Sequence, residues 1–157
     1  MTKIVYASRF NPLHLDVLRQ RFPEVNFVSA TDVESQVREL PDADGIISWP
    51  TPEGLAATKR LRWVHLPFAG IEGIRNLPQL LDMDGVVITN SRGAHAASIA
   101  DHLFAFMLSL TRNVPLLLEH KKTHTWDRIA AGRGARELSG STLGIIGLGK
   151  IGTEIAK

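Results

Sequence analysis

The sequence predicts an α/β fold built on a doubly wound parallel sheet. Two observations lead to this prediction: short, mostly β-branched runs recur through the first half of the chain, and amphipathic segments separate them. Such alternation is typical of parallel strands joined by right-handed helical crossovers, with helices on both faces of the sheet. The predicted strands are Lys3–Ala7, Asn26–Ala30, Gly45–Trp49, Trp63–Phe68 and Gly85–Thr89.

Proline and polar capping residues mark the helices between these strands. After Asn11-Pro12 the apolar residues follow helical spacing up to Pro23. Asp32 is the predicted N-cap of the next helix, which Pro41 ends. A third helix is predicted over Pro52–Arg62, where apolar residues again share one face.

The pattern changes after Asn90, which indicates a second structural unit. Ala96–Arg112 is a long helical stretch with a broad apolar face. Near its start, Ser98 and Asp101 form an S-x-x-D pair, and this pair favours a helix cap over a role in ligand binding.

The rest of the chain predicts further helices, a surface connection and one more strand. Asn113 and Pro115 mark the end of the long helix and the start of another. Ala131–Ser141 is rich in glycine, serine and charge, which is typical of a surface connection, and Thr142–Ile146 is predicted to be a strand. We therefore expect two parts: residues 1–95, and residues 96–157 with linking helices and the start of a further, incomplete domain.

A glycine-rich motif follows this last predicted strand. Its pattern, G-x-G-x-x-G, is formed by Gly147, Leu148, Gly149, Lys150, Ile151 and Gly152. In dinucleotide-binding domains the first glycine permits a tight turn, the second lets a pyrophosphate approach the backbone, and the third allows close packing of helix on strand. The motif predicts that these six residues bind NAD or NADP, with a purely structural glycine turn as the alternative.

Other catalytic motifs find less support. A G-x-x-x-x-G-K pattern ends at Lys150, yet Ile151 stands where a nucleotide triphosphate loop needs a hydroxyl for magnesium. His120 and His124 are four residues apart, but H-E-x-x-H is absent, so a solvated helix end is favoured over a metal site. We expect no metal.

Composition excludes several classes of protein. The 157 residues carry 18 basic and 16 acidic side chains, and these are interspersed, so a nucleic-acid partner is not expected. Without cysteine there is no disulfide framework and no thiolate nucleophile. The longest apolar run, 103–108, is shorter than a signal-peptide core and far shorter than a membrane span, so we expect a cytoplasmic protein without a membrane partner.

Four pieces of the sequence, in order, resemble the D-isomer-specific 2-hydroxyacid dehydrogenase family, which includes glyoxylate/hydroxypyruvate reductases and phosphoglycerate dehydrogenase. The pieces are LRWVHLPFAGIEGI, VVITNSRGAHAASIADHLFAFMLSLTRN, the TW of Thr125-Trp126, and ELSGSTLGIIGLGKIG. The resemblance covers residues 61–157 and ends just after the glycine motif. The first sixty residues match the family's flavodoxin-like substrate domain by pattern only.

The resemblance implies an oxidoreductase that transfers a hydride between NAD(P)H and a small 2-oxo or 2-hydroxy acid. It implies that backbone N–H groups of Ala69 and Gly70 bind the substrate carboxylate. It places the catalytic arginine, carboxylate and histidine after the glycine motif, so none is assigned within this chain, and the chain alone is expected to be inactive. It also implies a homodimer joined through the stretch that includes Leu103 and Met107.

Two further sets of residues remain open on sequence grounds. Trp49 and Pro50 follow the third strand, where they could wall a ligand pocket or lie in the core. Arg92 and His95 could face an acidic substrate, but loop residues of these types are usually solvated. The alternative to an enzyme is a non-catalytic module, derived from the same family, that binds small carboxylates or a protein.

Overall fold

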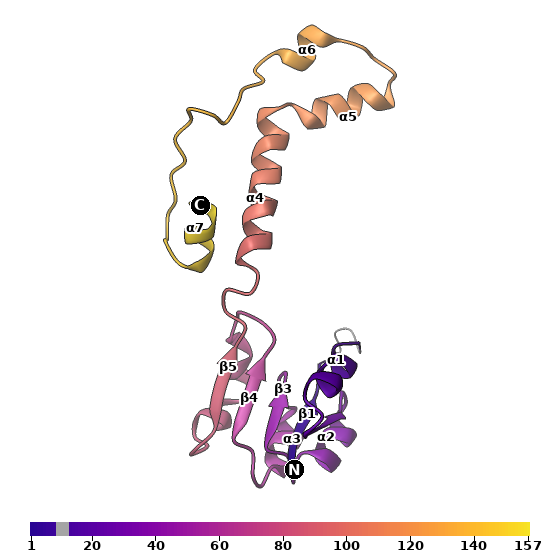
Figure 1. Cartoon of the computed structure of the whole chain (residues 1–157), viewed down its shortest axis with the longest axis vertical. Coiled ribbons are helices and arrows are strands. Elements are labelled where there is room, and N and C mark those ends of the chain that lie inside the picture. Colours follow the sequence, from indigo (N-terminus) through magenta and orange to yellow (C-terminus); the bar gives the residue numbers. More distant parts are fainter. Residues whose placement is uncertain (9–12) are drawn as a thin grey trace. The chain divides into compact units, whose positions relative to one another are not determined.

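The computed structural model describes residues 1–8 and 13–157 (Figure 1). The turn predicted at Asn11-Pro12 lies outside the described residues. The chain divides into two units, Met1–Arg92 and Gly93–Lys157, each described by itself below.

The first unit is built on a five-stranded sheet in which every pair of neighbouring strands is parallel. The strand order is β2-β1-β3-β4-β5, which is the flavodoxin-like order, with its topological switch point between β1 and β3. This confirms the predicted fold class. The strands are β1 (Thr2–Tyr6), β2 (Val25–Ser29), β3 (Gly45–Ile47), β4 (Trp63–Leu66) and β5 (Val87–Asn90).

Helical segments lie on both faces of this sheet. On one face, an apolar cluster contains Val64 and Leu66 of β4. Leu40 at the end of α2, Leu55 of α3 and Leu80 of a 3-10 segment belong to the same cluster. On the opposite face, Leu15 of α1 packs with Ile4, Tyr6, Phe27 and Ile47. The helical segments are α1 (Leu13–Arg21), α2 (Val33–Glu39), α3 (Pro52–Ala57), η1 (Glu72–Asn76) and η2 (Pro78–Leu81).

Hydrogen bonds to nearby polar side chains set the start of α2 and the end of α3. Asp32 is the N-cap of α2, as predicted, because its Oδ1 accepts the N–H of Ser35 at 2.8 Å. The helix predicted over Pro52–Arg62 is wrong in length, since α3 ends at Ala57. There the Thr58 hydroxyl donates to the Leu55 carbonyl at 2.7 Å and the backbone turns extended, so a local hydrogen bond replaces the next helical turn.

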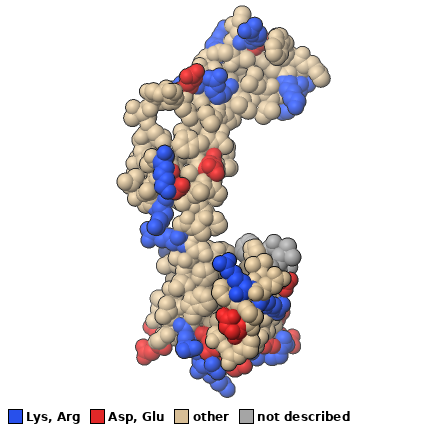
Figure 2. All heavy atoms as spheres, in the orientation of Figure 1, with Lys and Arg blue, Asp and Glu red and all other residues tan. Residues whose placement is uncertain are grey.

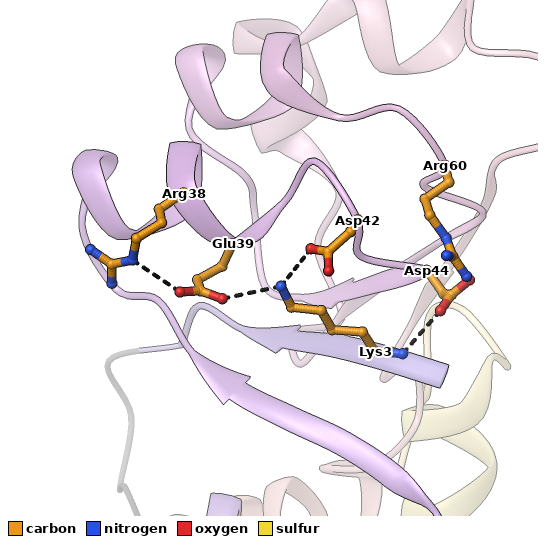
Figure 3. Close-up of polar contacts among 6 residues, drawn as sticks. All are labelled: Lys3, Arg38, Glu39, Asp42, Asp44 and Arg60. Atoms are coloured by element: carbon orange, nitrogen blue, oxygen red, sulfur yellow. Dashed lines mark hydrogen bonds and ion pairs between the residues drawn. The ribbon is translucent and has the colours of Figure 1, made fainter. Parts of the chain in front are cut away.

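Asp44 joins the amino ends of β1, β3 and β4, and Figure 3 shows the bonds of its carboxylate to Lys3 and Arg60. Asp44, 5% exposed, accepts the backbone N–H of Lys3 at 2.9 Å with one oxygen and the Arg60 guanidinium at 2.6 Å with the other. Its carbonyl accepts the N–H of Trp63. The bond from the Lys3 N–H, followed by the bond from Arg60, lowers the pKa of Asp44 from the usual 3.8 to about 2.

We expect the Asp44→Asn variant to melt lower than the natural chain by on the order of 5–10 °C at neutral pH, because it loses charge-assisted bonds at a buried position. The pKa of Asp44 is lower in the folded state, so this stabilisation is complete above pH 3.8 and is lost as the pH falls towards 2. Thermal unfolding between pH 2 and pH 7 measures both effects. Asp42→Asn, at a side chain 68% exposed, is the matched control and should change the melting temperature little.

The second unit consists of helices and extended segments. In Figure 1 the helix α4 (Ala96–Thr111) leads into α5 (Val114–Lys122) and α6 (Arg128–Gly132), and the unit ends with α7 (Lys150–Ile155). α7 packs against α4. The strand predicted over Thr142–Ile146 is wrong. These residues pair with no other strand, and the five described strands all belong to the first unit.

The cap predicted at the start of the long helix is also wrong. His95 is the N-cap of α4, so Ser98 already lies inside the helix, where its hydroxyl donates to the His95 carbonyl at 3.1 Å. The helix thus begins earlier than the S-x-x-D pair predicts. Pro115 lies in the first turn of α5, as expected, because a proline there costs no helical hydrogen bond.

Asn113 occupies the predicted N-cap position of α5, but its side chain makes its bonds elsewhere. Its backbone is left-handed, with φ 55°, and its side chain makes no capping bond to α5. Instead its Nδ2 donates to the carbonyls of Ala131 at 3.1 Å and Arg133 at 2.9 Å. Asn113 therefore ties the α4–α5 junction to the end of α6.

Candidate functional site

The loop after β4 lies at the carboxyl edge of the sheet, where open α/β sheets hold their ligands. The Asn90 Nδ2 at the end of β5 donates to the Ala69 carbonyl at 2.8 Å. The N–H of Ser91 donates to the carbonyls of Leu66 and Phe68 at 3.1 and 3.0 Å. These bonds hold the Ala69–Gly70 loop beside the last strand.

Ala69 and Gly70 present free hydrogen-bond donors. Among the described residues, none accepts a bond from the backbone N–H of either one. Ala69 is exposed and Gly70 is half-buried. Two adjacent free N–H groups on a loop without bulky side chains can bind a carboxylate.

Glu72 lies directly over this loop. A Cβ added at Gly70 would overlap the Glu72 carboxylate, with Cδ at 2.9 Å. The negative charge of Glu72 is thus next to the free donors, and an incoming anion must displace or oppose it. Sequence reasoning missed Glu72, because the spacing of residues 69–72 does not show which way the side chain folds.

An apolar cleft of about 690 Å³ opens beside the same strand ends. Its lining residues are Trp49, Ile71, Ile74, Leu81, Ile88, Thr89 and Asn90. Asn90 belongs both to this cleft and to the hydrogen bond that holds Ala69, so the cleft and the Ala69–Gly70 loop adjoin.

Trp49 is both a wall of the cleft and part of the core packing, so both sequence interpretations hold in part. A Cβ on Gly73 would lie 2.5–2.9 Å from indole atoms of Trp49, so only glycine lets η1 approach the ring this closely. Pro50 is buried.

Ser48 precedes Trp49 with a strained backbone. Its φ is 93°, a conformation that costs energy for any residue with a Cβ. Its N–H donates to the His65 carbonyl at 2.8 Å, which fixes the chain as it leaves β3. No sequence signal marks this position, because serine rarely adopts such a φ.

The glycine motif forms a tight turn into α7. Gly147 has φ +91°, which favours glycine, and a Cβ on Gly152 would collide with the Gly147 carbonyl oxygen. Nothing lies within 4 Å of the positions that a Cβ would take at Gly147 or Gly149. The turn is therefore closed on its helix side and open on its outer side, which fits the close approach of a pyrophosphate to the backbone.

The side chains of the motif have distinct surroundings. Leu148 is 72% exposed and Ile151 is 42% exposed. The Lys150 side chain extends along Gly93, where a Cβ would lie 3.3 Å from its Cγ. Lys150, which belongs to the motif, thus adds a positive charge to the unit that contains the glycine turn.

The other residues that the sequence singles out lie outside the Ala69–Gly70 loop, the cleft and the glycine turn, and a binding role of Arg92 and His95 stays a prediction. Arg92 and His95 are exposed. His124 lies beyond the end of α5 with φ 51°, so it does not share a helix face with His120. Across residues 1–8 and 13–157, no group of three or more metal-binding side chains comes together. Over the same ranges, no helix combines the length and the hydrophobicity that a membrane span requires.

The first unit is thus an open parallel α/β domain, and the second unit contains a tight G-x-G-x-x-G turn. Residues 104–157 match the family model described as D-isomer specific 2-hydroxyacid dehydrogenase, NAD binding domain. The D-3-phosphoglycerate dehydrogenase of Archaeoglobus fulgidus is 29% identical over 159 aligned residues, which cover 99% of this chain and 29% of that protein. The chain is thus similar to members of the D-isomer-specific 2-hydroxyacid dehydrogenase family.

Solved structures show the same fold over the whole chain. A D-isomer specific 2-hydroxyacid dehydrogenase family protein from Aeromonas salmonicida subsp. salmonicida aligns with a TM-score of 0.78 and 25% identity, covering 99% of this chain and 49% of that one. An NADPH-dependent glyoxylate/hydroxypyruvate reductase from Sinorhizobium meliloti, at 21% identity, has a TM-score of 0.77 over 99% of this chain and 48% of that one. The chain thus spans about half the length of these solved proteins and less than a third of the curated relative.

Proposed function

We propose that this chain takes part in NAD(P)-dependent hydride transfer on small 2-oxo or 2-hydroxy acids. In this proposal residues 1–95 bind the acid, and residues 96–157 link that domain to the start of the dinucleotide-binding domain. The observation that carries the proposal is the glycine turn, whose third glycine lies against the carbonyl of the first while the outer side stays open. The match of residues 104–157 to an NAD-binding domain supports it.

Each unit would contribute its own part of the binding. Backbone N–H groups of Ala69 and Gly70 would hold the substrate carboxylate. Backbone groups of Gly147–Gly152 and the ammonium of Lys150 would hold the cofactor pyrophosphate. Bound NAD(P) supplies or accepts the hydride. We propose that residues 1–157 alone bind both ligands without turnover, since the resemblance places the catalytic arginine, carboxylate and histidine after the glycine motif.

Two titrations of the isotope-labelled chain, followed by NMR of its backbone amides, test the two parts separately. We expect NADH to shift the amides of Gly147, Gly149 and Ile151, and glyoxylate to shift those of Ala69 and Gly70. NADH that leaves the glycine turn unchanged at millimolar concentration would refute the dinucleotide assignment. Glyoxylate shifts that avoid Ala69 and Gly70 would refute the substrate assignment.

The charge on Glu72 gives a further prediction. We expect Glu72→Gln to bind glyoxylate about three- to tenfold more tightly, because the variant removes a negative charge beside the free N–H groups without changing the size of the side chain. The gain should shrink in high salt. Glu53→Gln, an exposed carboxylate in the first turn of α3, is the control and should leave the affinity unchanged. Weaker binding by Glu72→Gln would mean that Glu72 supports the loop.

We also propose that a second copy of the chain packs against α4. In the second unit, all of whose residues are described, the buried hydrophobic residues are Ala96 and Ala100. Ile99, Phe106 and Leu110 share one stripe of α4 and are 40%, 58% and 68% exposed. A helix with such a stripe is typical of an interface. The same exposure also supports the alternative function, a non-catalytic module that binds a protein.

A further inference from the structure

The cleft beside the Ala69–Gly70 loop differs chemically from the loop. Five of its seven lining residues are hydrophobic, and none of the seven carries a charge. Of its two polar lining residues, Asn90 ends β5 and its amide bonds to the Ala69 carbonyl, whereas the Thr89 hydroxyl bonds with Trp63 and His65. The cleft is therefore polar next to the carboxylate loop and apolar away from it.

We propose that this cleft binds the apolar side chain of the substrate, so that the preferred acids are branched or aromatic 2-oxo acids rather than short or phosphorylated ones. The inference rests on the proposed function, because it takes the Ala69–Gly70 loop as the anchor of the carboxylate. The cleft volume of about 690 Å³ exceeds what a two-carbon acid needs and is in the usual range for small-molecule sites.

Solvation favours such a side chain over a charged one. An isobutyl or benzyl group that enters the cleft leaves water for contacts with Trp49, Ile74 and Ile88, and the gain grows with the apolar area removed from water. A phosphate group would meet no cation among the lining residues, so it would lose hydration without a partner.

Leu81 is the residue at which to test this inference. It ends η2 and is 68% exposed, so a charge introduced there reaches the cleft without entering the core. Leu81→Asp adds a negative charge to the apolar wall. Val37→Asp, on α2 at 41% exposure and outside the cleft, is the matched control.

The experiment measures dissociation constants by NMR titration of the full chain with glyoxylate, 4-methyl-2-oxopentanoate, phenylpyruvate and 3-phosphohydroxypyruvate. We expect the branched and aromatic acids to bind at least about tenfold more tightly than glyoxylate, and the phosphorylated acid to bind no better than glyoxylate. Leu81→Asp should reduce this preference at least about fivefold, and Val37→Asp should preserve it.

The outcomes separate this inference from the proposed function. Equal affinities for glyoxylate and the branched acid would overturn the inference and leave the carboxylate loop intact. Tighter binding of the phosphorylated acid would also overturn it. If no acid shifts Ala69 and Gly70, the proposed substrate site fails. In that case a neutral probe, 4-methylpentan-2-one, that still shifts Ile74 and Ile88 supports an apolar site, and its failure to do so overturns the cleft as well.

Discussion

Gly152→Ala should abolish measurable NADH binding and loosen α7 from the glycine turn. A methyl group at residue 152 would overlap the Gly147 carbonyl oxygen and lie 3.2 Å from Ile145 Cγ2, and a backbone oxygen cannot rotate away as a side chain can. Overpacking of this kind costs about 1–3 kcal/mol. α7 has six residues and is held by its packing on α4, so this cost is enough to shift the helix.

Gly149→Ala should separate binding from structure. Its φ is −82° and nothing lies within 4 Å of its Cβ position, so alanine is tolerated by the folded chain. The added methyl group would nevertheless occupy the open side of the turn, where the pyrophosphate approaches. We expect unchanged stability and at least a tenfold loss of NADH affinity.

Hydrogen exchange of the α7 amides and NADH titration distinguish the two variants. Gly152→Ala should accelerate exchange at Thr153 and Ala156, whereas Gly149→Ala should not. Gly132→Ala has open space at its Cβ position and ordinary φ, and it serves as the control that changes neither measurement. NADH binding that survives Gly149→Ala would show that the turn is structural and does not approach the cofactor.

The parallel sheet could be predicted from sequence because each strand is a short β-branched run with a helical segment behind it. Its four pairings are all parallel, as expected for strands joined by helical crossovers. The Asp32 cap could also be predicted, since its side chain bonds to Ser35, three residues further along the chain. In both cases the deciding interaction is local or is repeated along the chain.

The failures share a different cause. Thr142–Ile146 has the composition of a strand, but a strand needs a neighbouring strand to pair with, and the described structure offers none. Ser98 and Asp101 have the spacing of a cap, but α4 extends N-terminally beyond them to Ala96. The spacing of residue types in the sequence shows which structure a segment can form, but it does not show which other segments lie next to it.

The residues of the candidate site also form two groups: those that consecutive sequence predicts and those that depend on contacts with other segments. The six-residue glycine motif could be located because its chemistry lies in consecutive residues. Glu72 over Gly70, Asn90 on Ala69 and the strained Ser48 could not, because each depends on a side-chain rotation or on a contact between separate strands. These residues decide how an anion and its side chain would be held.

Replacing the exposed stripe of α4 should separate the proposed dimer into single chains. Phe106→Glu combined with Leu110→Glu replaces two large apolar side chains, 58% and 68% exposed, by carboxylates. Burial of each apolar side chain contributes about 1.5–3 kcal/mol, so the dissociation constant of the dimer should rise at least about 100-fold. Sedimentation should then give the 17.3 kDa of one chain rather than twice that mass.

A control variant distinguishes loss of the interface from loss of the helix. Ala105→Glu is also exposed and adds a charge to α4, but its position lies away from the Phe106 stripe, one turn after Asp101. Its mass should stay that of the dimer, and the helical circular dichroism of both variants should match the natural chain. If the natural chain already sediments at 17.3 kDa at micromolar concentration, the proposed dimer is wrong, and the alternative of a module that binds a different protein remains.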